Sequence, residues 1–254
     1  MKRYFLQLSY FGKNFNGWQA QKNIASTVQE IIEKNLSIVL QEQIEIVGCG
    51  RTDAGVHAKD YFAHFDSAKP DLAINKYLWL NKLNRICPVD IAFHDLIKVQ
   101  EDASARFQAI SRTYEYHIHK NKNVFLTEQS WLRAVDFDIN KMNEAASYLL
   151  EVTDFTSFSK VNTQTHTNNC NVTIANWKQE GDRLIFTIKA NRFLRNMVRA
   201  VVGTLLDVGE GKTSIEEFKK IVQSKNRSSA GKSVPAHGLY LTNIEYPETI
   251  FKRE

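Results

Sequence analysis

Segments with two different periodicities follow one another along the first hundred residues, and their order constrains the fold more than any other feature. Residues 4–10 alternate apolar and polar side chains, as a half-buried strand does. Apolar positions over residues 28–40 recur at helical intervals, after a Thr27–Glu30 pair with capping-box spacing. Further strands are predicted at 43–48, 60–66 and 92–100, and a helix at 71–83. This β-α-β-β-α-β order is typical of a ferredoxin-like unit.

The rest of the chain repeats this order with different residues. The predicted elements are a strand at 112–119, a helix at 138–150, a hairpin turned at residues 180–182, helices at 193–208 and 214–223, and a final strand, GLYLTNIEY. The polar stretch 157–170 is predicted to be a loop. We therefore expect an α+β fold of two ferredoxin-like halves, residues 1–104 and 105–254. Their mixed or antiparallel sheets would flank a central catalytic cleft.

Composition places the chain among ordinary globular proteins. Of its 254 residues, 43% are hydrophobic and 24% are charged. No apolar run approaches the roughly 20 residues that span a bilayer, and the first residues do not resemble a secretory signal. We expect a cytoplasmic protein without a membrane segment. Its cysteines, Cys49, Cys87 and Cys170, are too scattered to predict a disulfide framework or a cysteine zinc site.

The net charge of +5 is compatible with a polyanionic partner. Its distribution is more informative than its sum, because two clusters of cations lie in the second half of the chain. They are Arg192, Arg195 and Arg199, and Lys225, Arg227 and Lys232. Such runs are more often solvated surface than a binding site, so the charge alone does not decide whether the protein binds a polyanion.

The segment GCGRTDAGVHA, residues 48–58, is the best candidate for a chemical site. Its three glycines allow tight turns and close approach of a ligand to the backbone. Arg51 and Asp53 flank Thr52 and, in an extended segment, would point the same way. An ionised aspartate on such a bend, near a cation, is suited to nucleophilic or base catalysis. From the residues alone, an aspartate that merely caps a turn is about equally favoured.

Two other interpretations of this segment are weaker. A phosphate-binding G-x-G-x-x-G loop would need glycine where Asp53 stands. A metal site could use Asp53, His57, Asp60 and His64, but these residues lack a metal-ligand spacing such as H-E-x-x-H. We therefore predict that the protein holds no metal.

The string GRTDAGVHA resembles the catalytic signature of the tRNA pseudouridine synthase A family. Other segments resemble further blocks of that family in the same order, and together they span almost the whole chain. They are YFGKNFNGWQ, in which Phe11 replaces the usual Asp, ARFQAISRTYEY, TDFTSF, KANRFLRNMVRAVVG and AHGLYL. Residues 157–170 depart from the positively charged pattern that the family has in this region.

The resemblance implies an isomerase that converts uridine to pseudouridine at positions 38 to 40 in the anticodon arm of tRNA, without a cofactor. It implies that Asp53 is the essential carboxylate, acting on C1′ or as a base on the sugar, and that Arg199 pairs with it. Either role requires the ionised form, which a guanidinium favours. Arg51 would hold the target base extruded. Tyr114 would stack on the uracil, although core packing in its strand is the ordinary alternative.

The remaining basic residues carry weaker predictions. We expect Arg106 and Arg112 to contact phosphate or form structural pairs. Four others are candidates for the tRNA backbone: Arg192, Arg195, Lys225 and Lys232. The resemblance also implies a homodimer in which one tRNA contacts both subunits. Two rival functions stay open, a catalytically silent RNA-binding protein and a metal-dependent hydrolase of nucleotides.

Overall fold

A computed structural model of the protein describes residues 1–69, 72–161 and 166–251. The chain divides into two compact units, one formed by Met1–Ile110 with Leu241–Glu254 and the other by Ser111–Tyr240. The sequence-based division placed residues 241–254 with the second half, whereas the described part of this segment, residues 241–251, groups with the first unit. Residue 71 of the predicted helix and residues 162–165 of the predicted loop lie outside the described residues.

The first unit is built on a β-sheet. Its strands are β1 (Lys2–Tyr10), β2 (Val47–Gly48), β3 (His57–Ser67), β4 (Ile91–Lys98) and β9 (Leu239–Glu245). They lie in the order β4-β1-β3-β9, in which β1 pairs antiparallel with β3 and β4, and β2 pairs antiparallel with β3. Strand β1 is central, with antiparallel partners on both sides, and its aromatic and aliphatic side chains are fully buried. The final strand of the sequence therefore returns to the sheet that the first strand begins.

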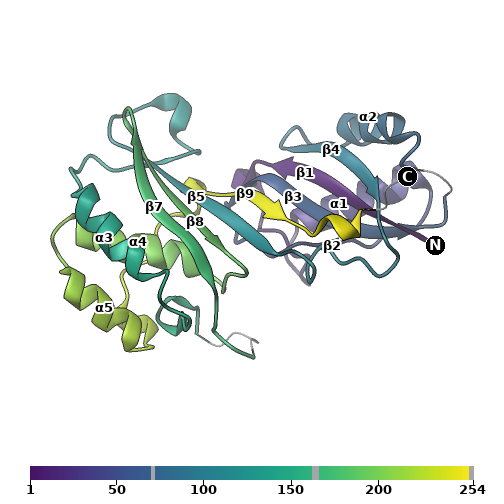
Figure 1. Ribbon diagram of the computed structural model, residues 1–254. Coiled ribbons are helices and arrows are strands. Elements are labelled where there is room, and N and C mark those ends of the chain that lie inside the picture. The colour runs from purple at the N-terminus through teal and green to yellow at the C-terminus, as the bar shows by residue number, and fades with distance from the viewer. Residues whose placement is uncertain (70–71, 162–165, 252–254) are drawn as a thin grey trace. The chain divides into compact units, whose positions relative to one another are not determined.

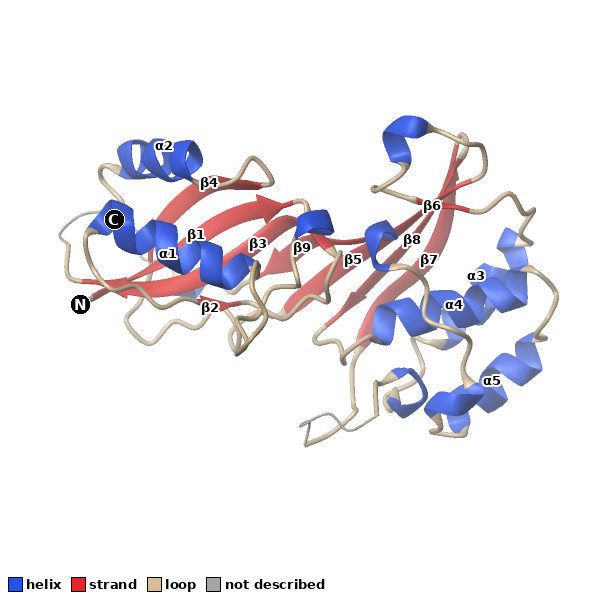
Figure 2. Cartoon of the chain, turned by 180° about the vertical axis from the view of Figure 1, so that it is seen from behind, coloured by secondary structure: helices blue, strands red, loops and turns tan. Residues whose placement is uncertain are grey.

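Two helices accompany this sheet. Helix α1 (Val28–Leu40) buries every fourth residue from Val28 to Leu40, and Figure 2 shows it running across one face of the strands. Thr27 caps it, because its Oγ1 accepts a hydrogen bond from the Glu30 N–H at 3.4 Å. Helix α2 (Lys76–Ile86) lies beside β4. It begins later than the predicted residue 71.

The predicted strand 43–48 is shorter than expected. Only Val47–Gly48 pairs as a strand. Both backbone groups of Ile46 bond to side chains of α1 instead: its N–H donates to Glu33 Oε1 at 3.0 Å, and its carbonyl accepts from Gln29 Nε2 at 3.1 Å. These groups are satisfied without a neighbouring strand.

The second unit contains the strands β5 (Ser111–His119), β6 (Trp131–Leu132), β7 (Val172–Glu180) and β8 (Arg183–Ala190). Strands β7 and β8 form the predicted hairpin, with Gly181 in a left-handed conformation at its turn (φ +59°). Strand β8 pairs antiparallel with β5, and β6 pairs parallel with β5.

The helices of this unit are α3 (Ile139–Tyr148), α4 (Met197–Gly209) and α5 (Ile215–Gln223), gathered on one side of the β7–β8 hairpin (Figure 1). Helix α4 is buried on almost every residue. The prediction that it begins at 193 is wrong. Asn196 is left-handed (φ 66°) and its side chain donates to Ser233 Oγ at 2.6 Å, so the helix begins at Met197.

Six single turns of 3-10 helix complete the described structure: Gly12–Asn14, Val124–Leu126, Thr156–Phe158, Arg227–Ser229, Ala236–Gly238 and Glu248–Ile250. The architecture is thus mixed α and β with mostly antiparallel strands, in agreement with the predicted α+β class. Among the described residues, none of the helices has the length and apolar character needed to cross a membrane.

Candidate functional site

The glycine-rich loop that carries Asp53 is fixed through its backbone. The Cys49 N–H donates to the Phe62 carbonyl at 2.8 Å, and the Tyr61 hydroxyl donates to the Gly50 carbonyl. Beyond Asp53 the chain turns tightly, since the Val56 N–H donates to the Asp53 carbonyl at 3.2 Å. Asp53 itself is half-buried. The carboxylate therefore stands on a bend whose two ends are anchored to the sheet.

A cluster of aromatic side chains from β1, β3 and the segment after β1 supports this bend. Trp18 stacks on Tyr61 with ring centroids 4.0 Å apart, and both rings are buried. The Tyr10 hydroxyl shares a 2.8 Å hydrogen bond with Thr52 Oγ1, and the Trp18 N–H donates to the Thr52 carbonyl at 3.2 Å. Thr52, the residue before Asp53, is thus held on both its side chain and its backbone.

Glycines in the early segment let the backbone approach the loop closely. A Cβ on Gly12 would lie 2.0 Å from the Val56 carbonyl oxygen, and one on Gly17 would lie 2.7 Å from the Thr52 carbonyl oxygen. Gly17 also has a φ of +82°, which side chains disfavour. The structure therefore brings together the two strings YFGKNFNGWQ and GRTDAGVHA, which are separated by about thirty residues in the sequence.

Three of the four residues of the alternative metal site accept hydrogen bonds from other parts of the first unit. His57 Nδ1 accepts from the Gly12 N–H at 2.9 Å, His64 Nδ1 accepts from the Ala105 N–H at 3.1 Å, and Asp60 Oδ1 accepts from Gln7 Nε2 at 2.8 Å. His57 also stacks on Phe11, with centroids 4.3 Å apart. Across residues 1–69, 72–161 and 166–251, no group of three or more potential ligands is placed to hold a metal ion.

Arg51 is exposed. Its Nε donates to Gln19 Oε1 at 3.1 Å. This contact takes one of the five N–H donors of a guanidinium. Gln19 is the last residue of the string YFGKNFNGWQ, but nothing in the sequence indicated that its side chain contacts Arg51.

Arg106 is also exposed and belongs to the first unit. Its guanidinium carbon lies 5.1 Å from the centroid of the Phe107 ring, within the range of a cation–π contact. Phe107 is 78% exposed, so an aromatic ring and a cation are presented together on this surface.

Tyr114 and Arg112 lie on β5 in the second unit. Tyr114 is half-buried and packs edge-on against Phe193, with centroids 5.0 Å apart. By contrast, Tyr116 is fully buried, and its hydroxyl donates to the Pro235 carbonyl at 2.9 Å. Arg112 Nη1 donates to the Asn191 carbonyl at 2.9 Å. Tyr116 is thus part of the core, while Tyr114 retains an accessible side.

Arg199 projects from α4 toward the segment that precedes β9. Its Nε donates to the Val234 carbonyl at 2.7 Å, and the Val234 N–H returns a 3.2 Å bond to the Arg199 carbonyl. Burial raises the pKa of the Tyr116 hydroxyl, and the nearby Arg199 charge partly opposes this rise. Arg199 is half-buried and positioned by tertiary contacts, as expected for a cation among apolar helix residues.

Arg192 and Arg195, from the same cluster, and Lys232, from the second cluster, lie outside the helix. Arg192 and Arg195 precede the left-handed Asn196, and the Arg195 carbonyl accepts the Lys160 N–H at 3.1 Å. Lys232 is exposed on the segment that crosses α4, where its carbonyl would meet a Cβ on Gly203 at 1.9 Å. These residues therefore gather around the start and the middle of α4.

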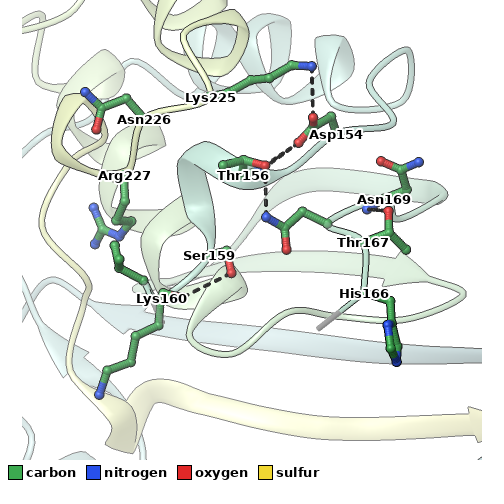
Figure 3. A pocket seen from close by; sticks show the side chains of 12 residues that line it. Asp154, Thr156, Ser159, Lys160, His166, Thr167, Asn169, Lys225, Asn226 and Arg227 are labelled. Carbon is green, nitrogen blue, oxygen red and sulfur yellow. Dashed lines mark hydrogen bonds and ion pairs between the residues drawn. The ribbon is translucent and has the colours of Figure 1, made fainter. Parts of the chain in front are cut away.

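Lys225 lies at a separate polar pocket of about 530 Å³ in the second unit (Figure 3). Its Nζ forms a 3.0 Å ion pair with Asp154 Oδ2, and Asp154 Oδ1 accepts the Thr156 N–H and hydroxyl at 2.9 and 2.6 Å. Burial opposes ionisation of Asp154, but the hydrogen bonds from Thr156 and Lys225 prevail and hold its pKa below the usual value. Lys160 and Arg227 also line this pocket.

Comparison with known proteins agrees with the sequence resemblance. Residues 145–247 match the profile of a family described as tRNA pseudouridine synthase. The chain is 49% identical, over the full length of both chains, to tRNA pseudouridine synthase A of Parabacteroides distasonis. It is 47% identical to the protein of the same name from Bacteroides thetaiotaomicron, with 100% of this chain and 94% of that one covered.

A more distant relative, tRNA pseudouridine synthase A of Francisella tularensis subsp. novicida, is 39% identical over all of this chain and 98% of its own. These matches define the class as pseudouridine synthase. Within it, the chain belongs to the tRNA pseudouridine synthase A family.

Proposed function

We propose that this protein isomerises uridine to pseudouridine in tRNA, with Asp53 as the catalytic carboxylate. The observation that carries the proposal is the full-length similarity to tRNA pseudouridine synthases A at 49% identity. The anchored bend that presents Asp53 supports the choice of residue, because a catalytic group must be held in a fixed geometry. We also propose that each of the two halves has a ferredoxin-like fold.

The reaction exchanges one glycosidic bond for another within the same nucleotide. The bond from C1′ to N1 breaks, the uracil turns, and C5 joins C1′; C5 then loses a proton while N1 gains one. Reactant and product are isomers, so the proposal requires no redox partner or group donor. Asp53 acts either as the nucleophile at C1′ or as a base that removes a sugar proton.

Three further residues have proposed roles in this reaction. Arg51 enters the space left by the target base and holds it extruded, since a base within a helix is inaccessible to the enzyme. Tyr114 stacks on the uracil with its accessible side. By the family resemblance, Arg199 is the guanidinium that favours the ionised carboxylate.

The substrate and the assembly are also part of the proposal. The target uridines are those at positions 38 to 40 of the anticodon arm, and the protein acts in the cytoplasm as a homodimer. Phosphate contacts are assigned to six cations: Arg106, Arg112, Arg192, Arg195, Lys225 and Lys232. Several exposed cations on one protein are suited to this task, because neutralising phosphates releases counterions.

Release of tritium from C5 of uracil in tRNA tests the proposal. The wild-type protein releases the label, and Asp53→Asn, which is nearly isosteric, reduces release to background while tRNA binding persists. Equal release by Asp53→Asn would overturn the role of the carboxylate. Binding without release by the wild type indicates a silent RNA-binding protein. Hydrolysis of the tRNA without release of label, abolished by EDTA, indicates the metal-dependent hydrolase.

A further inference from the structure

A chain of polar side chains links Arg51 to helix α1. Gln19 Oε1 accepts from Arg51 Nε, and Gln19 Nε2 donates to Gln29 Oε1 at 2.6 Å. Gln29 Nε2 in turn donates to Glu33 Oε1 at 2.9 Å. Gln29 and Glu33 are four residues apart on α1 and therefore share a face. Gln19, Gln29 and Glu33 thus form one hydrogen-bonded network of side chains.

Glu33 sets the orientation of the two amide groups, those of Gln29 and Gln19. An ionised carboxylate only accepts hydrogen bonds, so Glu33 requires the NH₂ group of Gln29 to face it. The oxygen of Gln29 then faces the other way, where it accepts from both Gln19 Nε2 and the Ala20 N–H, the latter at 3.1 Å. This leaves the oxygen of Gln19 toward Arg51. If the Gln19 amide were flipped, its NH₂ group would face the Arg51 guanidinium, and two hydrogen-bond donors would then oppose each other.

The same residues anchor the start of the catalytic loop. Glu33 Oε1 and Gln29 Nε2 bond the N–H and the carbonyl of Ile46, just before β2. Gln19, Gln29 and Glu33 are each only partly buried, so the hydrogen bonds and not a packed core hold them. One network therefore fixes both the entry of the loop and the side chain of its exposed arginine.

We infer that Gln19 is a positioning residue that presets the Arg51 guanidinium for insertion beside the target uridine, and that Gln29 and Glu33 hold Gln19 in the required orientation. The inference rests on the proposed function, since it assigns a device to Arg51. A long exposed arginine loses conformational entropy when it binds, and a preset side chain loses less. Base extrusion is the step that this device accelerates.

A double-mutant cycle tests the inference. Gln19→Leu lowers kcat/KM for tRNA about tenfold, the effect of one hydrogen bond to a charged group. In an Arg51→Ala background the same change has less than about a twofold effect, because residues that act through one partner are not additive. Equal factors in both backgrounds would mean that Gln19 acts independently of Arg51, and the inference fails.

Two further measurements separate positioning from a structural role. With 2-aminopurine beside the modified uridine, a rise in fluorescence reports base extrusion, and Gln19→Leu slows this rise. The thermal midpoint of Gln19→Leu stays near that of Gln43→Leu, an exposed control in the same unit.

Glu33→Leu reproduces the slow extrusion, and Glu33→Gln, which keeps an accepting oxygen, restores it. Unchanged extrusion in Gln19→Leu, or no rescue by Glu33→Gln, overturns the inference. Absence of isomerisation by the wild type would instead contradict the proposed function.

Discussion

Two regions that carry candidate residues are held in different ways. The loop with Asp53 is fixed by backbone hydrogen bonds, buried aromatic rings and glycines in close contact. The pocket with Lys225 is formed by side chains that bond one another at the surface, with Lys225 61% exposed. The first arrangement allows little adjustment, whereas the second can exchange its partners.

This difference corresponds to the chemistry proposed for each region. Attack on a sugar carbon depends steeply on position, and a misplacement of about 1 Å can cost about 100-fold in rate. A phosphate contact is a less demanding electrostatic interaction. The comparison therefore predicts that small steric changes near Asp53 have large effects and that charge changes near Lys225 have small ones.

The largest effect is expected for Gly12→Ala. The new methyl group would meet the Val56 carbonyl oxygen at 2.0 Å and the Val56 carbonyl carbon at 2.5 Å, so the backbone must shift. We expect a loss of about 3 kcal/mol in the free energy of unfolding, together with a marked loss of tritium release. Urea unfolding measures the first, and single-turnover kinetics measure the second.

Gly50→Ala is the matched control for stability, because apart from its own chain neighbours no described atom lies within 4 Å of the position of its Cβ. If Gly12→Ala unfolds at the same urea concentration as Gly50→Ala, the close contact does not restrain the loop. The contrast between the two regions would then lose its main support.

The order of the elements could be predicted from periodicity, because alternation and helical spacing are local properties. The errors arose where distant residues decide the local structure. Ile46 looks like part of a strand, but its backbone bonds side chains of α1. Residues 193–196 continue an apolar pattern, yet Asn196 adopts a left-handed conformation that a contact with Ser233 accompanies.

The loop could be named as a candidate site from its residue types, but the residues that support it could not. Tyr10 and Tyr61 fit the alternation of strands and cannot be distinguished from ordinary core residues in the sequence. Gly12 has no local signal that it faces Val56. The roles of Asp53, Tyr114 and Arg199 came from resemblance and stay predictions, as does the division of the chain at residue 104.

Acid sensitivity offers a second test of how the first unit is held. Burial lowers the pKa of His64 from 6.5 to about 4, and the Arg3 charge adds to this effect while Asp66 opposes it. The folded state thus binds a proton less readily than the unfolded chain, so stability falls as the pH drops from 6.5 toward 4. Between pH 7 and pH 5 we expect a loss of about 2 kcal/mol.

His64→Asn removes the titrating group and keeps an oxygen that can accept from the Ala105 N–H, as His64 Nδ1 does. The variant should lack this part of the pH dependence in urea titrations. His94→Asn, at an exposed position of β4, serves as the control and should retain it. Equal slopes for the wild type and His64→Asn would show that the buried imidazole does not govern the acid stability of this unit.

The smallest effects are expected at the pocket. Lys225→Ala should weaken tRNA binding by up to about 1 kcal/mol and reduce the salt slope of binding by about 1. Asp154→Asn should leave affinity unchanged or raise it, because it removes an anion that competes with phosphate for Lys225 while keeping an oxygen for Thr156. Filter binding at several salt concentrations measures both, with Lys178→Ala on the β7–β8 hairpin as a control outside the pocket.

If Asp154→Asn and Lys225→Ala weaken binding equally, the ion pair itself supports the fold of the pocket. The pocket would then resemble the Asp53 loop in being held rigidly, and Lys225 would not be a phosphate contact.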